Sequence, residues 1–196
     1  MRNMNIVSGT AEGLPGNIYS LTAAYRYKVF VERLGWQLST QNGFEQDQFD
    51  RPDTLYVVAR NELGEICGCA RLLPTTRPYL LAEVFPQLLN GASPPNVPEV
   101  WELSRFAAID LNANTTSALG HSSPIAIGLL KEAMACAMAR GADRLITVSP
   151  IGVERILQRG AFQRAGFHTH RAGPPIIIDG NPIFACWITC ESVGVQ

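Results

Sequence analysis

The stretch PIAIGLLKEAMACAMARGADRLITV, residues 124–148, contains the two elements that decide the fold class. Residues 124–140 predict an α-helix, because Pro124 stands near its first turn and Gly141 follows its last. The short apolar run 144–148 then predicts a buried strand. A helix that leads directly into a buried strand indicates a sheet covered by helices.

The rest of the chain extends this pattern in both directions. Before the central helix we expect an amphipathic helix at 19–35, antiparallel strands at 55–60 and 66–73, a short helix at 80–89 and a strand at 100–108. After it we expect a short helix at 153–159 and strands at 175–178 and 182–189. The sequence therefore predicts an α/β protein in α+β order, with one mixed sheet, helices on both faces and a single domain, 1–196.

The composition narrows the possible partners. Of 196 residues, 46% are hydrophobic and 17% charged, below the roughly 25% that is typical of soluble domains. The net charge of −1 indicates no bulk attraction to nucleic acid or membranes. No apolar stretch is long enough to span a bilayer, and the first residues lack a signal-peptide core. We therefore expect a cytoplasmic protein.

Five cysteines, an odd number, indicate reduced thiols in such a compartment. Cys67 and Cys69 are separated by one residue and would share a face of a strand. Because no second cysteine pair lies close by, we interpret them as small core residues rather than zinc ligands.

Charged residues stand inside apolar strands of this charge-poor chain. Arg71 lies in CGCARLL, and Glu102 and Arg105 lie in WELSRF. One interpretation is a set of surface ion pairs, each worth little. The other is a buried functional set, because buried charges are rare unless they are paired or functional. Strict alternation would put Glu102 and Arg105 on opposite faces, so we predict a bulge or a splay of the strand there.

At this point the chain resembles the acyl-homoserine-lactone synthases of the LuxI type, which make quorum-sensing autoinducers. The resemblance runs from about residue 25 to residue 188. It is most specific in four segments: YRYKVFVERLGW, FEQDQFD, GCARLLPTT and WELSRF.

The resemblance implies a three-layer fold like that of the GNAT acyltransferases, with a V-shaped splay in the sheet. It implies two substrates, S-adenosyl-L-methionine and an acyl chain carried on acyl carrier protein. An amide bond forms, the methionyl carboxylate then closes a lactone, and methylthioadenosine leaves. No metal and no bound cofactor are implied.

The chemistry assigns roles to particular residues. A general base must deprotonate the amine of S-adenosylmethionine, and Glu102 is our first choice, with Asp47 second. The oxyanion needs donors, for which we propose the backbone near Ser104 and Phe106, with Arg105 orienting the acidic residues. The resemblance implies that S-adenosylmethionine is bound, or its site organised, by Arg26, Phe30, Trp36, Glu45, Asp47, Asp50, Arg71, Phe85 and Phe106.

The second half of the chain should receive the acyl group. We expect an acyl pocket lined by Met134, Met138, Leu145, Ile146, Thr147, Ser149 and Trp187. Ordinary core packing would also explain these residues. Thr147 matches a position that the family links with 3-oxo chains, whereas other segments resemble synthases of medium, unsubstituted chains. Acyl carrier protein is acidic, and a basic patch of Arg144, Arg155, Arg159 and Arg164 would suit it.

Two other functions are compatible with parts of this pattern. An N-acetyltransferase that uses acyl-CoA would share the fold. Its glycine-rich pyrophosphate turn, however, is absent from ALGHSSPIAIG, which precedes the central helix. A ligand-binding regulator without catalysis is the other possibility, and the charged residues within the strands argue against it.

Overall fold

The computed structural model describes residues 4–112, 123–158 and 160–191. The chain divides into two compact units, which are described separately. Unit 1 comprises residues 1–72 and 105–133, and unit 2 comprises residues 73–104 and 134–196. The expected single domain stays a prediction.

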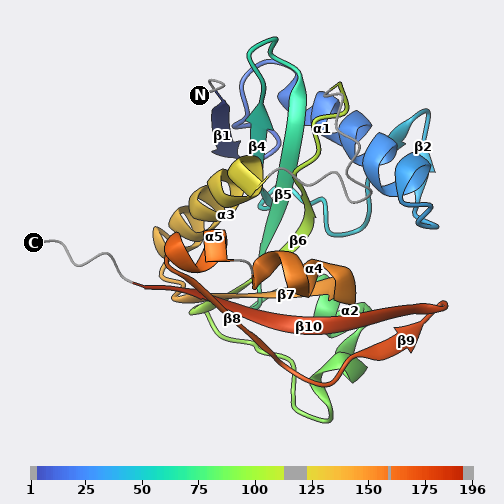
Figure 1. Cartoon of the computed structure of the whole chain (residues 1–196). Coiled ribbons are helices and arrows are strands. Elements are labelled where there is room, and N and C mark those ends of the chain that lie inside the picture. Colours follow the sequence, from blue (N-terminus) through green and yellow to red (C-terminus); the bar gives the residue numbers. More distant parts are fainter. Residues whose placement is uncertain (1–3, 113–122, 159, 192–196) are drawn as a thin grey trace, which may run out of the picture. The chain divides into compact units, whose positions relative to one another are not determined.

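The strands form one mixed sheet in the order β1-β4-β5-β6-β7-β10-β8, with β9 paired to β10 outside this path. In unit 1, β1 (Asn5–Gly9) pairs antiparallel with β4 (Leu55–Arg60), which pairs antiparallel with β5 (Ile66–Pro74) (Figure 1). β4 is buried along nearly all of its length, as its run of apolar residues predicts.

The predicted helix at 19–35 is divided into two kinds of helix. α1 is a regular helix over Ile18–Arg26, and a π-helix, η1, continues it over Tyr27–Arg33. The wider turn of η1 is visible in the bond from the Leu34 N–H to the Val29 carbonyl, five residues back. The predicted helix is therefore present, and its second half has the π form, which was not predicted. π-Helical turns occur frequently at functional sites.

A small hairpin lies within the segment 40–53, which the sequence presents as a loop. β2 (Thr40–Gln41) pairs with β3 (Phe44–Glu45) around Asn42 and Gly43, both of which have positive φ. Asn-Gly is the pair that favours such a turn. The hairpin brings Glu45 into the interior of unit 1, where it is fully buried.

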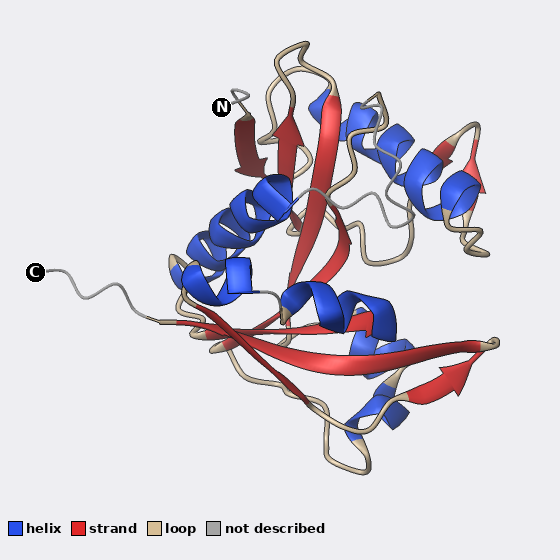
Figure 2. Ribbon diagram, viewed as in Figure 1, coloured by secondary structure: helices blue, strands red, loops and turns tan. Residues whose placement is uncertain are grey.

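Unit 2 is built on strands of mixed direction. The first part of β6 (Val100–Ala107), as far as Ser104, belongs to this unit. β6 pairs parallel with β7 (Arg144–Pro150). The long strand β10 (Asn181–Cys190) pairs antiparallel with β7, with β8 (Phe167–Arg171) and with β9 (Ile176–Ile178). Figure 2 shows β10 as the longest strand of this part.

Helices accompany these strands. α2 (Leu80–Val84) and the 3₁₀ helix η2 (Pro86–Leu89) together fill the predicted helix at 80–89. α3 (Ser123–Met138) is the central helix, and α4 (Ile151–Leu157) and α5 (Gly160–Arg164) follow β7. α4 contacts β7 and β10, and η2 also contacts β10. In the described part of the chain, none of the helices is long and apolar enough to cross a membrane.

Candidate functional site

Six charged side chains of unit 1 form a closed ring, which we call the ionic ring. Each of its three arginines binds two carboxylates, and each carboxylate binds two arginines. The order around the ring is Arg26, Glu45, Arg105, Asp47, Arg71, Asp50 and back to Arg26. The nitrogen–oxygen distances from Glu45 onward are 3.0, 2.8, 2.6, 3.2 and 2.7 Å. Alternation of charge makes the ring neutral, so its burial leaves no net charge uncompensated.

Asp50 is the most extensively bonded carboxylate of the ring. It accepts hydrogen bonds from both terminal nitrogens of Arg26, from the hydroxyl of Tyr56 at 2.9 Å and from the backbone N–H of Asp47 at 2.8 Å. Burial acts to raise the pKa of Asp50, but Arg26 and Arg71 outweigh it and hold that pKa well below its usual range. Asp50 is therefore ionised at neutral pH.

The arginines are fixed in the same way. Burial acts to lower the pKa of Arg26, but Asp50 and Glu45 outweigh burial and raise it. Burial likewise acts to lower the pKa of Arg71, but its hydrogen bonds to Asp47 and the charges of Asp47 and Asp50 outweigh burial and raise it. Fork-shaped guanidinium groups suit this arrangement, because each presents donors to two carboxylates at once.

The exposure of the ring is unequal. The side chains of Arg26, Glu45, Asp50 and Arg71 are between 0 and 3% exposed, whereas Arg105 is 6% and Asp47 13% exposed. Asp47 and Arg105, which bind each other at 2.8 Å, thus form the edge of the ring that is nearest to solvent.

Aromatic side chains cover the ring. The guanidinium of Arg105 lies over the ring of Phe30 at 5.8 Å, and that of Arg71 lies over Phe49 at 5.7 Å. Trp36 stacks on Phe30 with ring centroids 5.0 Å apart. The structure therefore brings together Phe30 and Trp36, two of the predicted site residues. It adds Phe49 and Tyr56, which sequence reasoning missed, although Tyr56 is the one polar-tipped residue in the apolar run LYVVA.

The backbone of β6 is irregular where the sequence predicted a bulge or splay. Arg105 has a φ of 49°, a left-handed conformation that is uncommon for residues other than glycine. The registered pairs between β6 and β7 run from Val100 with Arg144 to Leu103 with Thr147, just before this residue. A left-handed residue breaks the alternation of side chains, so the predicted distortion is present at Arg105.

Glu102 is fully buried in unit 2. Its two carboxylate oxygens accept the backbone N–H groups of Leu80 at 3.0 Å and Leu81 at 2.6 Å, at the start of α2. Ser104 is 5% exposed, and Phe85 and Phe106 are half-buried. Glu102 therefore fixes the first turn of α2, a contact that the sequence did not predict.

The predicted acyl-pocket residues do not share one surface. In the pairing of β7 with β10, Thr147 is opposite Cys186 and Ile146 is opposite Trp187. Because side chains alternate along a strand, Leu145, Thr147 and Ser149 lie on one face, and Ile146 and Trp187 lie on the other. One pocket lined by all of these residues would have to reach both faces of β7, and the acyl pocket stays a prediction. Met134 is buried, whereas Met138 is 49% exposed.

The predicted basic patch is only partly described. Arg144 and Arg164 are exposed, and Arg144 lies over the ring of Trp187 at 5.6 Å. The side chain of Arg155 and the whole of Arg159 lie outside the described residues.

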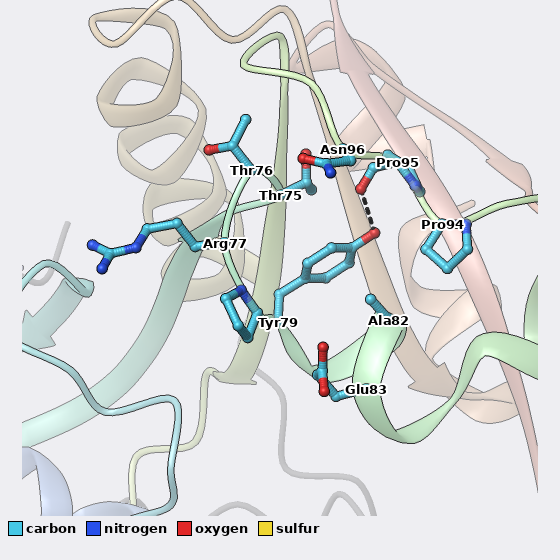
Figure 3. Close-up of a pocket in the computed structure, with 10 residues that line it drawn as sticks. Thr75, Thr76, Arg77, Tyr79, Ala82, Glu83, Pro94, Pro95 and Asn96 are labelled. Carbon is cyan, nitrogen blue, oxygen red and sulfur yellow. Dashed lines mark hydrogen bonds between the residues drawn. The ribbon is translucent and has the colours of Figure 1, made fainter.

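An open pocket of about 300 Å³ lies beside α2 in unit 2. Figure 3 shows Tyr79 between the turn at Thr75–Arg77 and the loop at Pro94–Asn96, with its hydroxyl donating to the Pro95 carbonyl at 2.7 Å. This contact and the bonds of Glu102 to Leu80 and Leu81 fix the segment on both sides of residue 80.

The fold is similar to that of an N-acyltransferase. An acyl-CoA N-acyltransferase from Pseudomonas aeruginosa superposes with a TM-score of 0.58 over 94% of this chain and 99% of that chain. The two sequences are 16% identical, so this likeness concerns the fold alone.

A narrower family is defined by sequence. The autoinducer synthase model matches residues 17–193, so the chain belongs to the autoinducer synthase family. The acyl-homoserine-lactone synthase of Acinetobacter nosocomialis is 55% identical over 186 residues, which are 94% of this chain and 99% of the relative. The protein is accordingly an acyltransferase that makes acyl-homoserine lactones.

Two solved structures of synthases are similar to this chain. TofI, in a ternary complex with an inhibitor and MTA, is 47% identical, with a TM-score of 0.78 over 94% of this chain and 91% of that chain. MesI, a CoA-dependent acyl-homoserine lactone synthase, is 26% identical, with a TM-score of 0.75 over 94% of this chain and 88% of that chain.

Proposed function

We propose that this synthase joins S-adenosyl-L-methionine to an acyl chain delivered on acyl carrier protein, closes the lactone and releases methylthioadenosine. The observation that carries the proposal is the ionic ring, which supplies carboxylates and a guanidinium at one edge. The MTA in the complex of TofI supports it, because that relative is 47% identical.

The methionyl part of the substrate is both cation and anion. We propose that it meets the ring at Asp47 and Arg105, the least buried of the six side chains. Asp47 suits the α-ammonium, and Arg105 suits the carboxylate, which a guanidinium binds through two parallel bonds. Phe30 and Trp36 would exclude water from the sulfonium and attract its charge.

The amine must lose a proton before it attacks the thioester. We propose Glu102 as the base, acting directly or through a water molecule. The partners of Glu102 include two neutral backbone amides, whereas Asp47 is bound to two guanidinium groups, so Asp47 is the weaker candidate. Ser104 and the backbone beside Phe106 would donate to the oxyanion.

The second step needs no further base. The methionyl carboxylate attacks its own γ-carbon, forms the C–O bond of the lactone and breaks the C–S bond, and the electron pair leaves on methylthioadenosine. Because both reacting groups belong to one molecule, orientation supplies much of the rate. Arg26 and Arg71 would contribute by fixing the carboxylates of the ring.

Two molecules are candidates for the acyl donor. The exposed arginines Arg144 and Arg164 favour acidic acyl carrier protein. Acyl-CoA is the second candidate, because MesI, at 26% identity, is a CoA-dependent synthase.

A direct comparison tests the proposal. The purified protein is given S-adenosylmethionine with the same acyl chain on acyl carrier protein or on coenzyme A, and the lactone and methylthioadenosine are measured by mass spectrometry. We expect kcat/KM to be at least tenfold higher with the carrier protein. Equal or higher values with acyl-CoA would overturn the proposed donor but not the synthase activity.

The basic patch provides a matched test of the donor. Replacing Arg144 and Arg164 by glutamate should raise KM for the acyl carrier protein, and the effect should weaken with added salt. Replacing Arg33, an exposed arginine of η1 in unit 1, is the control and should change little. A double variant that keeps its KM would exclude the patch as the docking site.

A further inference from the structure

The left-handed backbone of Arg105 requires something to hold it. A non-glycine residue in this region is strained, and such a residue persists only where its surroundings fix it. The conformation matters, because Arg105 is the one residue of β6 that belongs to the ionic ring. Its side chain is held by Glu45, Asp47 and Phe30. Those contacts act on the guanidinium, four bonds or more from the strained Cα.

One side chain acts on the backbone itself. The thiol of Cys69 donates a hydrogen bond to the carbonyl oxygen of Arg105, with a sulfur–oxygen distance of 3.2 Å. Cys69 lies on β5 and is 1% exposed. β5 and β6 are neighbours in the strand order, and both residues belong to unit 1 (Figure 1).

The surroundings of Cys69 favour a donor rather than a reactive group. It packs in a core cluster with Tyr25, Val29, Phe30, Ala107 and Ile109. Burial raises the pKa of this thiol to about 12, so the S–H proton is present at every physiological pH. The same cluster contains Phe30, over which the Arg105 guanidinium lies. Cys69 therefore binds the backbone of Arg105 and belongs to the same core cluster as Phe30, over which the Arg105 side chain lies.

We propose that Cys69 is a positioning residue for the synthase reaction, and that its thiol fixes the left-handed backbone of Arg105 and so aims the guanidinium at the exposed edge of the ring. Cys69 touches no substrate in this role. The consequence for substrate binding rests on the proposed function, in which Arg105 meets the methionyl carboxylate. The effect of Cys69 on the conformation of Arg105 does not depend on the proposed function.

Three variants separate this role from simple core packing. Cys69→Ala removes the donor, Cys69→Ser replaces it by a hydroxyl that can donate to the same carbonyl, and Cys67→Ala is the control. Cys67 lies on the same strand, is also 1% exposed and has the same side chain. All three are made in the full chain under reducing conditions, and their folding is checked by thermal denaturation.

The first readout reports on Arg105 without substrate. The Nε–H signal of Arg105 in an ¹⁵N–¹H NMR spectrum is assigned with an Arg105→Lys variant. We expect this signal to shift and to exchange faster with water in Cys69→Ala, and to stay near its original position in Cys69→Ser and Cys67→Ala. An unchanged signal in Cys69→Ala would overturn the proposal.

The second readout is kinetic. We expect Cys69→Ala to raise KM for S-adenosylmethionine about three- to tenfold, the range of one modest hydrogen bond, while kcat falls less. Cys69→Ser should remain within about twofold of the original protein. Equal effects of Cys69→Ala and Cys67→Ala, or failure of Cys69→Ser to restore KM, would show that Cys69 is only a core residue. A shifted NMR signal with an unchanged KM would keep the role of Cys69 toward Arg105 and reject Arg105 as the substrate contact.

Discussion

Arg26 binds Asp50 through two parallel hydrogen bonds of 2.7 and 3.0 Å, and neither side chain is more than 3% exposed. This pair joins α1 to the acidic segment after the β2–β3 hairpin. Removing one charge of such a pair leaves the other buried with one partner fewer. The cost of this loss exceeds the net stabilisation that the pair provides.

Asp50→Asn is therefore expected to lower the free energy of unfolding by about 3–5 kcal/mol. Asp53→Asn is the control, because Asp53 pairs with Arg51 at 3.3 Å and its side chain is 33% exposed. Asp53→Asn should lower the free energy of unfolding by no more than about 1 kcal/mol. Urea denaturation measures both, and equal losses would show that burial of the Arg26–Asp50 pair has no special weight.

The same carboxylate predicts how stability depends on pH. The pKa of Asp50 is lower in the folded protein than in the unfolded chain. Between these two values the unfolded state binds the additional proton, so stability rises with pH in this window. The contribution of Asp50 is thus complete above about pH 5 and is lost as the pH falls below about 4 toward the folded pKa.

Urea denaturation at a series of pH values from 3 to 7 tests this prediction. The difference in unfolding free energy between the original protein and Asp50→Asn should be constant near neutrality and shrink in acid. If this difference grew as the pH fell, the pKa of Asp50 in the folded protein would be raised rather than lowered.

The elements that sequence reasoning located best are those with an uninterrupted apolar pattern. The strand predicted at 55–60 is β4, Leu55–Arg60, and the helix predicted at 124–140 is α3, Ser123–Met138. β8 was missed because FHTHR places four polar side chains among five residues, and three of its five residues are exposed. The π form of η1 was not predicted, because a π-helix has no residue pattern that distinguishes it from an α-helix.

The candidate site was predicted in its members but not in its connections. All six residues of the ionic ring stand out in the sequence, because each is a charge in a charge-poor chain. The order in which they bind one another depends on side-chain geometry. Tyr56, which donates to Asp50, and Cys69, which donates to the backbone of Arg105, look like ordinary strand residues. Glu102 illustrates the limit most clearly, since its bonds to Leu80 and Leu81 join residues that are 22 and 21 positions apart.

Glu102→Gln tests the proposed base. The amide keeps the size of the side chain but cannot take a proton, so the acylation rate should fall by about 100-fold or more. The amide can accept only through its single carbonyl oxygen, so the first turn of α2 should also loosen. Hydrogen exchange at Leu80 and Leu81 follows that second effect separately.

Glu83→Gln provides the comparison, because Glu83 lies on α2 but is exposed. It should leave both the rate and the exchange unchanged. If the folded Glu102→Gln variant acylates at nearly the original rate while exchange at Leu80 and Leu81 rises, Glu102 serves α2 and is not the base.

The alternation of β7 makes a prediction about the acyl chain. Thr147 and Ile146 are adjacent, both are buried, and their side chains lie on opposite faces of the strand. Only one of these faces can line a single acyl channel. We expect it to be the face of Thr147 and Ser149, because a hydroxyl beside an apolar chain can recognise a polar substituent at its 3-position.

Thr147→Val should therefore change the ratio of 3-oxo to unsubstituted lactones several-fold when the enzyme is offered both donors. Ile146→Val, a change of similar size on the opposite face, should leave that ratio the same. Mass spectrometry of the products from a mixed donor pool measures both variants in one experiment. A shift caused by Ile146→Val alone would place the acyl channel on the face of Ile146 and Trp187, which is also the face of Glu102 in the pairing of β6 with β7.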